Sequence, residues 1–170
     1  MDIIKSKTTQ GLCTPEMIDY RLGSVELISD YARGQLANSL ALLPKEVINF
    51  IVENYVFISR EEDESGSQWT FSSVHFKDKK GFILLNSNIW EKKPTEIAFT
   101  IAHEVAHAFK GHEVGGITAK KGIKQEKEAD KLAVNWLGKY YKKSVLIKLC
   151  KSKIHEKRYK SFSMKKVGCG

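Results

Sequence analysis

The sequence contains few cysteines and no long run of apolar residues. Its three cysteines, Cys13, Cys150 and Cys169, are odd in number and widely separated, and none forms a C-x-x-C pair. This spacing argues against both a disulfide scaffold and a cysteine zinc site. No stretch approaches the ~18 apolar residues that a membrane span needs, and the N-terminus lacks the apolar core of a secretion signal. We therefore expect a soluble protein of the reducing cytoplasm, without membrane association.

Positive charge is concentrated at one end of the chain. The 170 residues carry a net charge of +8, but residues 139–170 alone hold 11 basic residues and one acidic residue. The remaining residues, 1–138, are close to neutral, which excludes a uniform polycation. With 42% hydrophobic residues the chain is long enough to bury a core. We expect a single domain over residues 1–170, with a basic helical C-terminal segment at 139–170.

The first third of the sequence has the pattern of helices. Thr14-Pro15-Glu16 combines a hydroxyl cap, a first-turn proline and an early carboxylate, which together are typical of a helix start. Apolar residues then recur at three- and four-residue steps to about Ala32, and the same spacing returns after Pro44. Two or three N-terminal helices are predicted.

The middle of the sequence changes to short β-type runs. They cover residues 55–58, 69–76 and 81–85, and residues 61–66 and 77–81 between them are rich in turn-forming and charged residues. This pattern predicts a small three-stranded antiparallel sheet. Helical spacing then resumes from Pro94 to about Gly111 and from about Lys124 to Leu137. The fold class expected is α+β.

The most informative segment is His103-Glu104-Val105-Ala106-His107 on the helix that begins at Pro94. Two histidines four residues apart on a helix rise from one face, so their ring nitrogens can converge on one ion at ~2.0–2.1 Å. The helix carries its aliphatic stripe elsewhere, so we expect the histidines to face a cleft. This spacing is typical of a zinc site.

Two histidines are too few for a catalytic zinc ion, which usually takes three protein ligands. The next predicted helix offers Glu126, Glu128 and Asp130. Glu126 and Asp130 are four residues apart and share a face, whereas Glu128 lies about 200° around the helix from Glu126. Helical phase therefore favours Glu126 over Glu128 as the third ligand.

These residues resemble the gluzincin pattern of thermolysin-like metallopeptidases and, more closely, the small ImmA/IrrE-like metallopeptidases. The similar segments are Leu84-Leu85-Asn86, Phe99-Thr100-Ile101-Ala102-His103-Glu104-Val105-Ala106-His107 with His112 beyond, and Glu126-Lys127-Glu128-Ala129-Asp130-Lys131-Leu132-Ala133. The resemblance covers about residues 55–138, which would form a core of zincin type with an active-site helix and a second ligand helix. Asp130 stands where the ImmA/IrrE-like family usually has Asn, in agreement with the wider gluzincin pattern.

The resemblance implies His103, His107 and Glu126 as ligands of Zn²⁺, Glu104 as general base and later acid, and Asp130 as the residue that holds a ligand histidine. The chemistry asks for the same residue types. Zinc acidifies water and polarises a carbonyl, and a carboxylate adjacent to a ligand can take the proton of that water and return it to the leaving amine. An Asp is also a strong acceptor for an imidazole N–H.

A peptidase also needs a donor for the oxyanion, and residue type alone does not single one out. The candidates are His112, Tyr140, Tyr141 and His155. His112, near the expected helix end, is better explained as a histidine that interacts with the helix dipole.

Three functions remain open at the level of sequence. The leading hypothesis is a zinc metallopeptidase that hydrolyses a protein or peptide, with site-specific cleavage of a transcriptional regulator suggested by the resemblance. The second is a non-hydrolytic, metal-containing interaction protein. The presence of Glu104, the expected general base, favours the enzyme over this alternative. The third is nucleic-acid binding through the lysines and tyrosines of residues 139–170, although such lysines are more often the solvated face of a helix.

Overall fold

The computed structural model describes residues 14–22, 29–60, 81–112 and 118–151. Its elements, in chain order, are α1 (Pro15–Leu22), α2 (Asp30–Leu40), α3 (Lys45–Asn54), β1 (Tyr55–Arg60), β2 (Gly81–Asn86), the 3-10 helix η1 (Ser87–Glu91), α4 (Pro94–Lys110), α5 (Ala119–Leu137) and α6 (Lys143–Cys150). The protein is mixed α and β and mostly helical, as the α+β expectation requires. The expected strand at 69–76 lies outside the described residues, as does the basic segment beyond residue 151.

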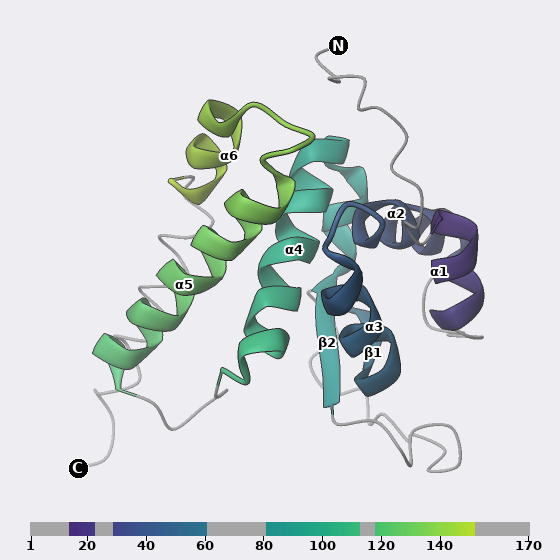
Figure 1. Ribbon diagram of the computed structural model, residues 1–170, viewed down its shortest axis with the longest axis horizontal. Helices are drawn as coiled ribbons and strands as arrows, with labels where there is room; N and C mark the ends of the chain where they lie inside the picture. The colour runs from purple at the N-terminus through teal and green to yellow at the C-terminus, as the bar shows by residue number, and fades with distance from the viewer. Residues whose placement is uncertain (1–13, 23–28, 61–80, 113–117, 152–170) are drawn as a thin grey trace.

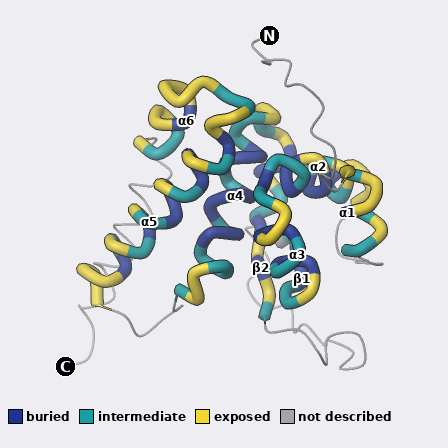
Figure 2. The backbone as a smooth tube through the Cα atoms, viewed as in Figure 1, coloured by how far each residue is buried: buried dark blue, intermediate teal, exposed yellow. Residues whose placement is uncertain are grey.

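Helix α4 occupies the middle of the structure (Figure 1). It packs along α5 on one side and against α2, α3 and β2 on the other, and α6 contacts both α4 and α5. From Ile97 to Phe109 no residue of α4 is exposed, and the burial colouring shows the same enclosure (Figure 2). The apolar residues Ile97, Ile101 and Val105 anchor it in the core. The site residues on α4 are therefore held by the most enclosed element of the fold.

The helix boundaries predicted from local sequence signals are largely confirmed. Helix α1 begins at Pro15, where the Thr14 hydroxyl accepts a hydrogen bond from the backbone N–H of Met17 at 3.3 Å. Helix α4 begins at Pro94 and ends before Gly111, whose φ of 62° is the left-handed conformation that favours glycine at a helix end. Local chemistry thus sets both ends of the helix that carries the histidines.

Two helix predictions need correction. The helix expected from residue 14 to about Ala32 is instead two helices, because α1 ends at Leu22 and α2 begins at Asp30 with the Ser29 hydroxyl as its cap. Helix α5 begins at Ala119, five residues before the expected start at Lys124. The Thr118 hydroxyl accepts from the backbone N–H of Lys121 at 3.3 Å, and this cap allows the helix to begin earlier.

The antiparallel pairing predicted for the sheet is wrong for the two strands that the structure describes. Strands β1 and β2 pair in parallel, with Tyr55 opposite Gly81 and Arg60 opposite Asn86. Parallel strands need a crossover connection of a dozen or more residues, and the 20 residues from 61 to 80 are long enough for one. The turn-forming residues in this segment had suggested hairpins. They do not determine which strands become neighbours.

Strand β2 joins the sheet to the site helix through η1. Its side chains alternate, with Ile83 and Leu85 in the core and Phe82 and Leu84 exposed. Within the part of the chain that the structure describes, no helix is long and apolar enough to cross a membrane.

Candidate metal centre

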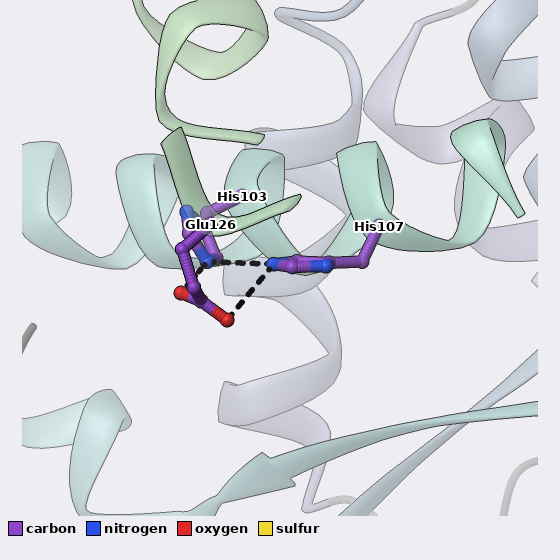
Figure 3. A group of neighbouring side chains, drawn as sticks. All are labelled: His103, His107 and Glu126. Carbon is purple, nitrogen blue, oxygen red and sulfur yellow. Dashed lines mark hydrogen bonds and ion pairs between the residues drawn. The ribbon is translucent and has the colours of Figure 1, made fainter. Parts of the chain in front are cut away.

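Helix α4 brings two imidazole rings together one helical turn apart. The Nε2 atoms of His103 and His107 are 3.0 Å apart, and the ring centroids are separated by 4.7 Å (Figure 3). This convergence follows directly from the spacing of four residues on a helix.

Helix α5 adds the carboxylate of Glu126 to the two imidazoles. Its Oε2 atom lies 3.2 Å from Nε2 of His103, and its Oε1 atom lies 3.4 Å from Nε2 of His107. One ligand atom from each of the three residues can be chosen so that all lie within 4.8 Å of one another. Figure 3 shows the carboxylate and both ring nitrogens directed at one another. The structure therefore assembles three candidate ligands from two helices.

The expected open cleft is absent on the His103 side of this group. Because α5 packs along the histidine face of α4, the side chain of His103 is only 1% exposed, whereas that of His107 is 20% exposed. Glu126 and Asp130 on α5 are buried as well. Among the described residues, His107 is therefore the most exposed of the three candidate ligands.

Asp130 orients the first histidine. Its Oδ1 atom lies 2.9 Å from Nδ1 of His103, and a carboxylate only accepts hydrogen bonds, so the ring donates from Nδ1. A neutral His103 then carries its lone pair on Nε2, which faces Glu126 and His107. This is the arrangement in which a second carboxylate fixes the tautomer of a metal-binding histidine.

The pKa of His107 is lowered to about 4. Burial of the ring is the main cause, and the neighbouring His103 lowers the pKa further, while Glu126 and Glu104 oppose the shift. His107 is thus neutral near pH 7, which is the form of imidazole that binds a metal ion.

Glu104 lies beside the three candidate ligands and is not one of them. Its charge acts on the ring of His107, and its side chain is partly exposed. At about 100° per residue around the helix, it projects to one side of His103. The structure thus keeps a carboxylate next to the two histidines while leaving the ligand positions to other residues.

The rival acid, Glu128, points away from this group. Its carboxylate oxygens lie 3.5 Å from Nζ of Lys110 and 3.6 Å from Nε2 of His112, and its side chain is 40% exposed. The pKa of Glu128 is lowered; burial opposes this shift, and contacts with Lys110 and His112 produce it. The structure brings Glu126, rather than Glu128, to the two imidazoles.

His112 makes a contact that the sequence reasoning missed. Its Nδ1 atom lies 3.0 Å from Nδ1 of His107. The available signals were the glycine at position 111 and the short separation of the two histidines, but neither predicts a contact between the rings. Of the other oxyanion candidates, Tyr141 is half-buried with its pKa raised by burial, and His155 lies outside the described residues.

The donor set fits a divalent transition-metal ion. Two imidazole nitrogens and one carboxylate converge, and each of these groups can offer a lone pair to the same point. Zinc sites are built from the same ligand types.

An open pocket of about 930 Å³ lies elsewhere, between α1 and α2, and is lined by Asp19, Tyr20 and Arg33 among others. None of the candidate ligands lines it.

Comparison with known families bears directly on this group of residues. The family model for the IrrE N-terminal-like domain, Peptidase_M78, matches residues 60–141. These are 82 of the 170 residues, slightly less than half of the chain, and over this segment the chain is similar to that family. The matched segment contains β2, α4 and α5, and with them the three candidate ligands, Glu104 and Asp130. Searches of the curated proteins and of the solved structures found no match.

This match confirms the resemblance seen in the sequence and agrees with a metallopeptidase. A metallopeptidase needs a metal ion, and the group of His103, His107 and Glu126 is a place where this IrrE-like chain could hold one. The matched segment leaves α1, α2 and α3 outside it. These helices supply much of the core against which α4 packs.

Proposed function

We propose that this protein is a zinc-dependent peptidase that hydrolyses peptide bonds in a protein substrate. The observation that carries the proposal is the convergence of His103, His107 and Glu126 on one point, with Asp130 behind the first histidine. Zinc is the metal proposed because two imidazoles and one carboxylate are a common ligand set of catalytic zinc, in which a further position stays open.

In this proposal the residues of the chain have separate tasks. When bound, zinc supplies Lewis-acid chemistry that acidifies water and polarises the scissile carbonyl. Glu104 takes a proton from the attacking water and delivers it to the leaving amine nitrogen. Asp130 holds His103 in the tautomer that leaves Nε2 available.

The surface near α4 supports a peptide as the substrate. Strand β2 leads into η1 and α4, and it presents Phe82 and Leu84 to the exterior with 45% and 59% of their surface exposed. Extended peptides are commonly recognised by backbone pairing at a strand combined with apolar side-chain contacts. The resemblance to ImmA/IrrE-like proteins suggests a regulatory protein as the physiological substrate.

The test begins with the metal. Purified protein should contain one zinc per chain, and X-ray absorption should show nitrogen and oxygen ligands only. A Zn–S shell near ~2.3 Å would contradict the proposed ligands. Protein that takes up no zinc at neutral pH would remove the basis of the proposal.

The second step separates hydrolysis from binding. Glu104→Gln keeps the shape of the side chain and removes the base, so the variant should keep its zinc and its fold. Cleavage of a proteome-derived peptide library, followed by mass spectrometry of new N-termini, should fall by a factor on the order of 10²–10⁴. Equal cleavage by wild type and variant at equal zinc content would exclude this mechanism. Loss of zinc from the variant would show that Glu104 is itself a ligand.

A further inference from the structure

The end of α4 places a third histidine against the second candidate ligand. The backbone N–H of Gly111 donates to the carbonyl of Ala108 at 3.1 Å, and the N–H of His112 donates to the carbonyl of His107 at 3.0 Å. These two bonds, with the left-handed Gly111, form a Schellman motif, in which the residue after the glycine returns to the residue five positions earlier. In this motif an apolar contact often joins these two positions. In this protein the contact is between the imidazole rings of His107 and His112.

The two rings touch through specific nitrogens. Nδ1 of His112 is 3.0 Å from Nδ1 of His107, and the ring centroids are 4.9 Å apart at an angle of 74°. The side chain of His112 is only 8% exposed. Two ring nitrogens this close form a hydrogen bond when one carries a hydrogen and the other a lone pair, so one ring donates and the other accepts.

A bound ion would determine which ring donates, because it takes the Nε2 lone pair of His107 and leaves the hydrogen of that ring on Nδ1. Without the ion, Oε1 of Glu126, 3.4 Å from Nε2 of His107, favours the opposite placement. The Nε2 atom of His112 faces Oε2 of Glu128 at 3.6 Å, and a negative carboxylate favours a hydrogen on the nitrogen that faces it. Lys110 holds the other oxygen of Glu128 at 3.5 Å. With its hydrogen on Nε2, neutral His112 has its lone pair on Nδ1 and accepts from His107. His107 then carries its hydrogen on Nδ1 and leaves Nε2 available.

We propose that His112 is a positioning residue that accepts the Nδ1–H of His107 and thereby holds the Nε2 lone pair of His107 toward His103 and Glu126. It would serve His107 as Asp130 serves His103. In the opposite tautomers a hydrogen on Nε2 of His107 would point at Nε2 of His103 and block the position of the ion. Glu128 does not face the candidate ligands. It contacts Nε2 of His112 and so forms the outer end of this chain of contacts.

The first test locates the hydrogens of the two rings in the zinc-loaded protein, and it rests on the proposed function. Near neutral pH, long-range ¹⁵N–¹H correlation spectra should show His112 as the Nε2–H tautomer, and the Nδ1 hydrogen of His107 should resonate downfield because it is hydrogen-bonded to His112. His112→Phe keeps a planar ring and removes the acceptor, so this hydrogen should shift upfield. Finding His112 as the Nδ1–H tautomer in the zinc-loaded wild type would overturn the proposal.

The second test measures zinc affinity by competition with a chromophoric chelator, and for this readout the inference rests on the proposed function. His112→Phe should weaken binding about 10- to 100-fold, as is typical when the outer partner of a ligand histidine is lost. His112→Asn supplies an amide oxygen near the former Nδ1 and should recover part of the affinity. Ile101→Val, a buried change on the core side of α4, should leave the affinity unchanged and so controls for loosening of the helix.

The remaining outcomes are also decisive. Zinc affinity of His112→Phe within about twofold of the wild type, with the His107 Nδ1–H signal unchanged, would overturn the positioning role. Loss of one nitrogen from the X-ray absorption shell of this variant would overturn it too, since His112 would then be a ligand. If His112→Phe does not fold, the tautomer of His112 in the wild type and the zinc affinity of His112→Asn decide whether His112 has the positioning role. Wild-type protein that takes up no zinc would defeat the proposed function and this inference with it, whereas zinc-loaded protein in which His112 is the Nδ1–H tautomer would overturn this inference alone.

Discussion

Nδ1 of His103 and Oδ1 of Asp130 lie 2.9 Å apart, although the two residues are 27 positions apart in the chain and on different helices. The contact is buried, with His103 1% and the side chain of Asp130 13% exposed. A hydrogen bond between a histidine and a carboxylate is strengthened when water is excluded. It joins α4 to α5 at the point where the candidate ligands meet.

The first prediction concerns this contact. Asp130→Ala removes the acceptor of the His103 Nδ1–H, so zinc affinity should fall about 10- to 100-fold. Asp130→Asn retains an acceptor oxygen and should lose less. Asp30→Ala, which removes an exposed carboxylate from the start of α2, is the control and should leave affinity unchanged. Competition titration with a chelator measures all three, and equal affinities for Asp130→Ala and wild type would contradict the prediction.

The second prediction separates the two glutamates of α5. Glu126→Gln removes the charge from a side chain within 3.4 Å of both imidazoles, so zinc binding should weaken markedly. Glu128→Gln keeps an acceptor oxygen on a 40% exposed side chain and should have little effect. Zinc content after dialysis at a fixed chelator concentration distinguishes them. The opposite ranking would make Glu128 the third ligand.

The third prediction concerns the thiol of Cys150. Burial raises the pKa of this thiol to about 11, and the negative charge of Asp130 adds to the increase. A raised thiol pKa means less thiolate at a given pH, so at pH 8 only about one thiol in 10³ is reactive, against roughly one in four for an ordinary cysteine of pKa ~8.5. In a Cys13→Ser, Cys169→Ser background, alkylation at pH 8 should be roughly 250-fold slower in folded than in denatured protein.

The pH dependence of the same alkylation provides the check. Below pH 10 the rate in the folded protein should rise about tenfold per pH unit, because the thiolate fraction does so well below the pKa. Asp130→Ala should speed the reaction, since it removes one cause of the raised pKa. A rate that levels off near pH 9 in the folded state would show an ordinary thiol pKa.

Local signals in the sequence predicted the parts of the site that local geometry controls. The spacing of His103 and His107 fixes their common face, because an α-helix has 3.6 residues per turn. Pro94 and Gly111 mark the ends of α4 by restricting or permitting particular backbone angles. The same periodicity separated Glu126 from Glu128 on α5, and the structure brings Glu126 to the histidines.

Features that depend on contacts between distant segments were harder to predict. The parallel pairing of β1 and β2 is decided by which strands meet in space, and turn-forming residues between them carry no information about that choice. Likewise, an aliphatic stripe on α4 suggested that the histidine side was open, whereas α5 covers it and buries His103. The contact of His112 with His107 depends on the direction of a side chain beyond the helix end, which periodicity does not describe.

The enclosure of α4 has a consequence for how an ion would leave the protein. No residue from Ile97 to Phe109 is exposed, so α4 cannot unwind without disrupting the core, and its amide hydrogens should exchange only through global unfolding. Helix α5 presents Lys120, Lys124, Lys127 and Lys131 to solvent and packs through one side. Opening of α5 alone would separate Glu126 and Asp130 from histidines that stay in place. Because Ala133 and Leu137 of α5 are themselves fully buried, this opening would also expose part of the core, so a bound ion should leave slowly by that route.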